Sequence, residues 1–182
     1  MSSLSSTQLS GLGPLLCFQG VDRIALLDKT AYSEVAYQVS KAGCQRSKLE
    51  VFAGKAKEAF GEISKWNGAQ LQEIGSVLGG FSGDDLKQLN PTVMPYFPAS
   101  AIPELPKDVF KTLSAEQIKS LSAETAGAVT AEQKAALSQE QKIALNAALN
   151  NSFRTVGNRE ASLSASATIV LLMVTLTIFL FK

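Results

Sequence analysis

Hydrophobic positions in residues 1–150 recur at the spacing of helices. Apolar side chains return after three or four residues in several stretches, and runs of β-branched residues are few. The recurring positions include Ile24, Leu27, Val35, Val39, Leu71, Ile74 and Leu78. Because such steps return to one face of an α-helix, the pattern predicts an all-α domain.

A second pattern, an eight-residue repeat, occupies the later part of this domain. Its apolar positions are Leu113, Leu121, Val129, Leu137 and Leu145, and most are followed by Ser or Thr, a small or polar residue, and Glu. In three units a hydroxyl residue stands three positions before a glutamine: Ser114 and Gln117, Thr130 and Gln133, Ser138 and Gln141. At this spacing an N-cap hydroxyl and an N3 side chain satisfy each other's backbone donors, so each unit predicts a new helix start.

The alternative is one long amphipathic helix in which the Ser and Thr residues are incidental. An eight-residue step turns a helix about 80° beyond two turns, so the apolar positions would leave one face. Separate helices of one or two turns are unstable alone and must pack on their neighbours, which predicts a superhelical stack of short helices. Upstream, the same rhythm is looser across 81–89 and 102–110, where prolines divide the chain.

The C-terminal sequence differs in kind from this domain. Residues 163–181 carry no charged side chain, and only Lys182 follows them. As a helix this stretch would extend about 28 Å, close to the roughly 30 Å hydrocarbon thickness of a bilayer. We predict a helical ectodomain over 1–150, a polar spacer over 151–162 and a membrane-attachment segment over 163–182.

Small residues, a polar spacer and an apolar tail in this order are typical of a signal for a glycosylphosphatidylinositol (GPI) anchor. Asn150 is the predicted attachment site, with Gly157 and Ala161 as competitors. A single membrane-spanning tail is the alternative. Residues 1–10 have neither the positive nor the apolar part of a secretory signal, so the anchor hypothesis also predicts that the chain is the C-terminal part of a longer precursor.

Composition narrows the classes of function. The 182 residues include 17 Lys and Arg against 16 Asp and Glu, so no excess of positive charge favours nucleic acid. Histidine, the commonest general base and a frequent metal ligand, is absent from the sequence. Asp84 and Asp85 lack the other ligands of a calcium loop and are predicted to favour a helix start. We therefore expect no enzyme, no cofactor and no metal site.

The cysteines and one asparagine are the candidates for covalent modification. Cys17 and Cys44 have no metal-type spacing, so they would form a disulfide outside the cell, or remain free thiols in the cytosol. Asn150 also opens the one usable N-glycosylation sequence, 150–152, since proline blocks the one at 90–92. A glycan and an anchor at Asn150 exclude each other.

Aromatic residues and glycines are the remaining positions with a predicted role in packing or binding. Trp66 and the pair Tyr96 and Phe97 are predicted to pack in the core or between repeats. The alternative for Tyr96 and Phe97, which lie among prolines, is an exposed surface for a partner. The glycines of residues 75–83 are predicted to supply permissive backbone at a helix end, because no phosphate-binding sequence surrounds them.

Residues 74–89 combine Leu-Gly-Gly with Asp-Leu-Lys in one segment, and further distinctive motifs surround it. These are residues 13–17, Lys65 with Trp66, residues 101–103, Phe110 and residues 128–133. Together they resemble the family of mesothelin, stereocilin and otoancorin. The resemblance covers roughly residues 11–150 and includes no catalytic signature.

The resemblance implies an extracellular glycoprotein with helical repeats related to armadillo arrays, often GPI-anchored, that acts in cell adhesion or attachment to extracellular gels. Members of the family are longer and carry secretory signals and several glycosylation sites, from which this chain departs. We predict a membrane-anchored adhesion or recognition protein on the extracellular face of the cell membrane, with a protein or glycan partner on the matrix or another cell. The alternative is a tail-anchored or single-span helical adaptor that faces the cytosol.

Overall fold

Helices account for all the regular structure in the described part of the chain. The structure, a computed structural model, describes residues 11–150, except for the side chains at positions 13 and 14. Within that range the elements are α-helices or 3-10 helices (η), with no strand, so the all-α prediction is confirmed. The elements are η1 (Gly13–Phe18), α2 (Val21–Ala25), α3 (Lys29–Ser40), α4 (Arg46–Phe60), η2 (Ile63–Lys65), α5 (Gly68–Ile74), η3 (Gly75–Gly80), α6 (Gly83–Lys87), η4 (Pro91–Tyr96), η5 (Ala99–Ala101), α7 (Lys107–Phe110), α8 (Ala115–Lys119), α9 (Ala123–Gly127), α10 (Ala131–Ala136) and a helix over 139–150.

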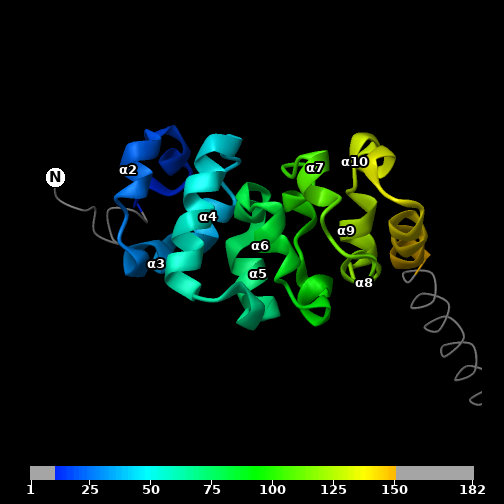
Figure 1. Ribbon diagram of the computed structural model, residues 1–182. Coiled ribbons are helices and arrows are strands. Elements are labelled where there is room, and N and C mark those ends of the chain that lie inside the picture. Colours follow the sequence, from blue (N-terminus) through cyan, green and yellow to red (C-terminus); the bar gives the residue numbers. More distant parts are fainter. Residues whose placement is uncertain (1–10, 151–182) are drawn as a thin grey trace, which may run out of the picture. The chain divides into compact units, whose positions relative to one another are not determined.

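The helices lie beside one another in nearly the order of the chain (Figure 1), from α2 and α3 to α10. The two longer helices α3 and α4 pack together, and α4 also covers η3. Later, each short helix contacts the element three places before it: α8 lies on η4, α9 on η5 and α10 on α7. The buried apolar side chains form one cluster that runs from Leu16 to Ala148.

One apolar position repeats every eight residues through the second half of the described chain and is buried each time. Each of its residues is at most 4% exposed, and they are Phe81, Leu89, Phe97, Leu105, Leu113, Leu121, Val129, Leu137 and Leu145. Helices begin two positions after each of the first eight, at 83, 91, 99, 107, 115, 123, 131 and 139, and Leu145 lies inside the last of these helices. The predicted separate short helices are therefore present, and the looser rhythm predicted over 81–89 belongs to the same series. In the next stretch the repeating residues are Phe97 and Leu105, and not positions 102 and 110 as predicted.

The starts of these helices carry the predicted capping boxes. In α8, Ser114 Oγ accepts a hydrogen bond from the backbone N–H of Gln117, and Gln117 Oε1 accepts one from the N–H of Ser114. The same two bonds recur in α10 and in the helix over 139–150. In α6 the box joins Ser82 to Asp85, with Asp84 in the same first turn, so the paired aspartates do start a helix.

The amide groups of the capping glutamines reach an earlier part of the chain. Gln117 Nε2 donates to the carbonyl oxygens of Leu86, 2.9 Å away, and Leu89, 2.8 Å away. Gln133 and Gln141 each bond two carbonyls that lie 28 to 31 residues earlier. One side chain thus starts its own helix and satisfies carbonyls at the end of an earlier one.

Two other side chains at the same helical position make related contacts. Thr125 Oγ1 in α9 donates to the carbonyl oxygen of Phe97, 2.6 Å away and 28 residues earlier. Asp85 in α6 pairs with Lys57, whose Nζ is 3.1 Å away and also 28 residues earlier. The side chain at this position of each of these short helices therefore bonds to a group about 28 residues earlier in the sequence.

The first helices depend on a cap and on aromatic packing. Asp28 starts α3 because its carboxylate accepts hydrogen bonds from the N–H groups of Thr30, at 2.8 Å, and Ala31, at 3.3 Å. Tyr32 in α3 is buried and stacks on Phe52 in α4, with ring centroids 6.2 Å apart. These contacts fix α3, which carries one side of the groove described below.

Trp66 lies in the core, as predicted. Its side chain is 3% exposed, and its ring meets Phe60 and Phe81 edge-on. Its indole N–H donates to the carbonyl oxygen of Gly61, 3.2 Å away, so the one polar atom of the side chain is satisfied.

Cys17 and Cys44 form a disulfide, which is the first of the two alternatives left by the sequence. Their Cα atoms are 5.0 Å apart, and the bond ties η1 to the segment between α3 and α4. Both cysteines are buried, and the Lys48 ammonium group donates to the carbonyl oxygen of Cys17.

The glycines of residues 75–83 correct part of a prediction. Gly75 ends α5 with φ +54°, so it does supply permissive backbone at a helix end. Gly79 and Gly80 instead lie inside η3 with negative φ, where they permit close packing. A Cβ at Gly80 would collide with the backbone carbonyl of Leu49 in α4. The sequence could not distinguish these roles because both require the absence of a side chain.

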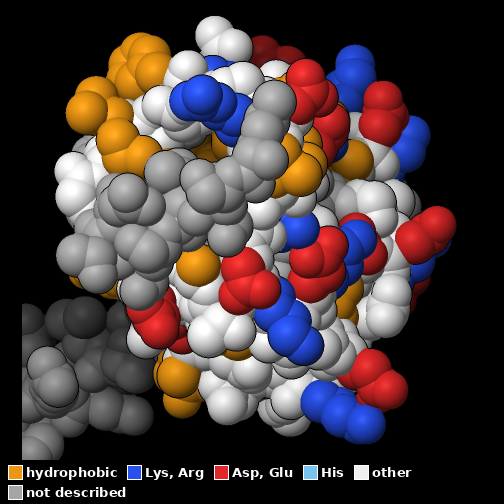
Figure 2. Space-filling view, turned by 90° about the vertical axis from the view of Figure 1, so that its left-hand side faces the viewer, with side chains coloured by type: hydrophobic (Ala, Val, Ile, Leu, Met, Phe, Trp, Pro, Cys, Tyr) orange, Lys and Arg blue, Asp and Glu red, His pale blue; other side chains and the backbone are white. Residues whose placement is uncertain are grey.

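Charged groups of both signs are interspersed on the face shown in Figure 2, which looks at the end of the molecule that carries α2 and α3. Hydrophobic side chains gather toward the upper left of this view. Exposed large apolar side chains in this part of the sequence include Phe18, at 80%, Leu26, at 60%, and Leu15, at 55%. This face therefore offers apolar surface beside mixed charge.

The described residues up to Leu149 belong to one compact unit. Among residues 11–150 no helix is long and apolar enough to cross a membrane. The predicted spacer over 151–162 and attachment segment over 163–182 lie outside the described residues.

Candidate functional site

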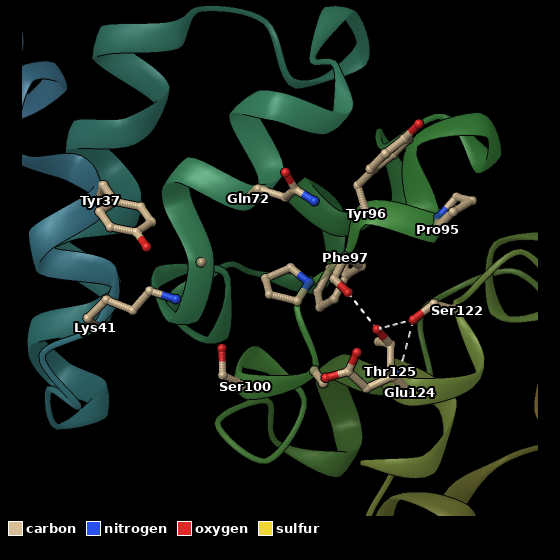
Figure 3. A pocket seen from close by; sticks show the side chains of 13 residues that line it. Tyr37, Lys41, Gln72, Pro95, Tyr96, Phe97, Ser100, Ser122, Glu124 and Thr125 are labelled. Atoms are coloured by element: carbon tan, nitrogen blue, oxygen red, sulfur yellow. Dashed lines mark hydrogen bonds between the residues drawn. The ribbon is translucent and has the colours of Figure 1, made fainter.

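A surface groove of about 520 Å³ lies where α3, α5, η4, η5 and α9 meet (Figure 3). Tyr37 and Lys41 project from α3 on one side, and Tyr96 and Glu124 belong to the opposite side. The segments come together because α3 packs on α5, α5 on η4, and α9 on η5. A cavity within the usual range of roughly 300–1,000 Å³ can hold a small molecule or a short peptide segment.

Tyr96 and Phe97, the candidate partner surface, face opposite environments. The Tyr96 side chain is 51% exposed, whereas Phe97 is 2% exposed and belongs to the eight-residue buried series. The Phe97 side chain therefore packs in the core, the role that the sequence favoured, and of the pair Tyr96 alone is exposed for a partner. Its carbonyl oxygen is fixed by Thr125 Oγ1, and Thr125 Oγ1 is 2.8 Å from Ser122 Oγ, as the dashed lines in Figure 3 show.

The Tyr96 ring rests on the start of α5. A Cβ at Gly68 would lie against the Tyr96 ring, so the glycine at this position lets the aromatic ring approach the backbone closely. Pro95 precedes the tyrosine and restricts the backbone of η4. One side of the Tyr96 ring therefore packs on the start of α5, while the other side remains exposed.

The opposite rim is formed by α3. Tyr37 is 58% exposed, and Lys41 Nζ lies 5.2 Å from the centre of its ring, a cation–π contact. Tyr37 and Lys41 are four residues apart on the helix, so the contact requires no other element. Tyr37 and Tyr96 together give the groove two exposed aromatic rims.

The groove carries one group of each charge. Neither Lys41 nor Glu124 takes part in an ion pair among residues 11–150. The side chains of Gln72 and Ser100 are exposed between them, and Figure 3 places Ser100 between Lys41 and Glu124 in this view. The arrangement supplies stacking, hydrogen bonds and charge pairing, all of which serve binding.

Groups with shifted pKa values lie outside the groove. Burial opposes ionisation of Asp85, but hydrogen bonds from Ser82 and Lys57 outweigh it and lower the pKa of the carboxyl group. Backbone hydrogen bonds lower the pKa of Asp28, and a hydrogen bond from Lys111 lowers that of Asp108. These shifts follow from helix caps and ion pairs.

Tyr32 is a buried phenol with a raised pKa, and it lies in the core and not in the groove. Burial, and next the charge of Glu73, raise the pKa of its hydroxyl, which has no hydrogen-bond partner among residues 11–150. Within the same range no three Cys, Asp or Glu side chains are grouped to hold a metal ion.

Comparison with known proteins finds human otoancorin at 37% identity over 102 residues, and mouse otoancorin at 36% over the same length. This chain is similar to otoancorin. The match covers 56% of this chain, and it spans 9% of the length of either otoancorin. No model of a protein family matches the chain. What otoancorin as a whole does is therefore carried to this chain only as a proposal, and the likeness to mesothelin and stereocilin stays a prediction.

The modification candidates stand apart from the groove. The Cys17–Cys44 disulfide joins η1 to the segment between α3 and α4, and neither cysteine lines the groove. Asn150 is exposed at the end of the described helix over 139–150. Its use as an anchor site or as a glycan carrier stays a prediction, and Gly157 and Ala161 lie outside the described residues.

Proposed function

We propose that this chain is a cell-surface adhesion or recognition protein, held on the extracellular face of the membrane through its C-terminal segment. The similarity to otoancorin over 102 residues is the observation that carries the proposal. It agrees with the family resemblance of residues 11–150, which implies adhesion to a matrix or to another cell.

The disulfide supports an extracellular location. Disulfides form and persist in oxidising compartments and are rare in the cytosol. The alternative, a tail-anchored helical adaptor that faces the cytosol, requires Cys17 and Cys44 to remain reduced. Thiol labelling of the purified chain therefore separates the two: the proposed function predicts that neither cysteine reacts before reduction.

The arrangement of the short helices supports a superhelical stack related to armadillo repeats. Helix starts recur every eight residues, and side chains at position N3 bond to groups 28 to 31 residues earlier. Because this offset is nearly constant, each layer of short helices packs on an earlier one in the same way, as in solenoid proteins. Such stacks present extended surfaces, which suits recognition of a protein or glycan partner.

The C-terminal sequence supports lipid attachment. Small residues at 150–152, a polar spacer and the apolar segment 163–182 are the parts of a GPI signal. In this proposal the peptide bond after Asn150 is broken, residues 151–182 leave together, and the ethanolamine of the lipid anchor is joined to the new carboxyl terminus of Asn150. Asn150 then carries the anchor and no N-linked glycan.

Release from cells tests the proposal. The full chain would be expressed behind a secretory signal, with an N-terminal tag, and the cells treated with phosphatidylinositol-specific phospholipase C. We expect the tagged protein to leave the surface, and adhesion of the cells to a matrix or to partner cells to fall with it. The matched control replaces residues 163–182 by a membrane span with a basic cytoplasmic flank, which should resist release. Retention of the natural chain would contradict the lipid anchor, and release without loss of adhesion would contradict the adhesive role.

A further inference from the structure

We propose that the groove between α3 and the segment η4–α9 binds an extended, proline-rich peptide segment of a protein partner, with an acidic residue at Lys41 and a basic residue at Glu124. This inference rests on the proposed function and names the chemistry of the partner. Its test uses binding in solution, so its failure is distinguishable from a failure of surface anchoring.

The two exposed tyrosines favour this occupant. Tyr37 is 58% exposed and Tyr96 is 51% exposed, and they come from opposite rims of one groove (Figure 3). Proline-rich segments in the polyproline II conformation dock into grooves lined by aromatic side chains, between which proline rings fit. Pro95 and Pro98 in the lining add apolar surface between the tyrosines.

The groove is organised before any ligand binds. The Tyr96 ring is supported by the backbone at Gly68, and the Tyr37 ring by the ammonium group of Lys41, 5.2 Å from its centre. The Phe97 carbonyl below them is fixed by Thr125. Rims that are already ordered lose little conformational entropy on binding, and a polyproline II segment is itself stiff.

Hydrogen-bonding groups match an extended backbone. A polyproline II segment makes no internal hydrogen bonds, so its carbonyl groups need donors from the protein. The Gln72 amide and the Tyr37 hydroxyl lie at the groove and can donate, whereas the Tyr96 hydroxyl points away from it (Figure 3).

Charge distinguishes a peptide from a neutral glycan. Lys41 and Glu124 lack ion-pair partners among residues 11–150, and both line the groove. A peptide with one acidic and one basic side chain around its prolines would pair with both groups. A neutral sugar has no charge to place at either position, so the two charges favour the peptide. The cavity of about 520 Å³ has room for a short segment and not for a folded domain.

The experiment measures binding of labelled peptides to the full chain, purified in detergent, by fluorescence anisotropy. Four peptides share one proline-rich centre and differ in their flanking charges: one acidic and one basic, two acidic, two basic, or none. A fifth keeps the acidic and basic residues and replaces the prolines by glycines. We expect the proline-rich peptide with both charges to bind best, and the Tyr37→Ala and Tyr96→Ala variants to bind it about tenfold more weakly.

Charge reversal gives the sharper result, because it predicts a change of preference that a damaged fold would not produce. Glu124→Lys should move the preference to the peptide with two acidic residues, and Lys41→Glu to the one with two basic residues. The design does not depend on the direction in which the peptide lies. Lys119→Glu, at an exposed lysine outside the groove, is the matched control and should leave the preference unchanged.

Three results would overturn the inference. The first is equal binding of the proline-rich and glycine peptides, or no binding of either. The second is an unchanged preference in both charge-reversal variants. The third is binding of neutral oligosaccharides, but not of the peptides, with loss in the tyrosine variants, which would assign the groove to a glycan.

Discussion

The side-chain amide of Gln117 donates a hydrogen bond to the backbone carbonyl of Leu89, 2.8 Å away and 28 residues earlier in the chain. The same glutamine completes the capping box that starts α8. One buried side chain thus links the start of one short helix to the end of an earlier one. Because Gln133 does the same in α10, these links hold successive layers of short helices in place.

Removing one of these amides should destabilise the protein in proportion to its burial. Gln133 is 2% exposed and bonds the carbonyls of Ile102 and Leu105, so Gln133→Ala leaves buried acceptors without a donor. We expect a loss of about 1–3 kcal/mol in the free energy of unfolding, measured by urea denaturation. Gln141 makes equivalent bonds at a more exposed place, so Gln141→Ala is the matched control and should cost less. Equal losses would contradict the role given to burial.

Close packing of η3 on α4 gives a second prediction. Gly80→Ala places a methyl group against the backbone of Leu49, and backbone cannot move aside as cheaply as a flexible side chain. We expect a loss of about 1–3 kcal/mol in the free energy of unfolding, seen as a lower midpoint in thermal denaturation. Gly54→Ala is the control: a Cβ there meets no atom within 4 Å, and alanine favours the α4 helix by about 0.5–1 kcal/mol. A neutral Gly80→Ala would show that the two elements are not in contact.

The disulfide should contribute more than either of these changes. Replacing Cys17 and Cys44 together by serine opens a link across a sequence separation of 27 residues, for which the loss of chain restriction costs about 3–4 kcal/mol. Reducing agent should lower the unfolding midpoint of the natural chain and leave that of the serine variant unchanged. If reduction affected neither protein, the bond would not contribute to stability.

Acid should weaken the pair between α6 and α4. Interactions with Ser82 and Lys57 lower the folded-state pKa of Asp85 below its ordinary value of 3.8, despite the opposing effect of burial. A group with a depressed pKa stabilises the fold above the unfolded value, and this contribution disappears as the pH falls through the folded value. The difference in unfolding free energy between the natural chain and Asp85→Asn should therefore be full near pH 7 and shrink below pH 3.8. A difference that stayed constant down to pH 2 would contradict this assignment.

Much of the local structure could be predicted from the sequence, because capping boxes are local signals. Ser114 and Thr130 marked their helix starts correctly, and the spacing of Leu113 and Leu121 separated short helices from one long helix. The repeat was less visible upstream because 3-10 helices with prolines replace capped α-helices there. Phe97 nevertheless occupies the same buried position in that region.

The groove could not be predicted, because its residues come from distant segments. Tyr37 lies in α3 and Lys41 caps the end of that helix, and Tyr96 lies about 60 positions later, so no spacing in the sequence joins them. The sequence singled out Tyr96 and Phe97 as a pair, but adjacent residues in a tight turn point in different directions. The target of the Gln117 amide was equally hidden, since a capping box accounts for that side chain without a second partner.

Mass spectrometry of the C-terminus tests whether the protein is anchored at the cell surface through a lipid. The full chain would be expressed behind a secretory signal, extracted from membranes and digested, and its last peptide identified. We expect a new terminus at Asn150, which carries an ethanolamine-linked glycan in place of residues 151–182. An intact C-terminal peptide that ends at Lys182 would contradict lipid anchoring and would favour a single-span or tail-anchored protein.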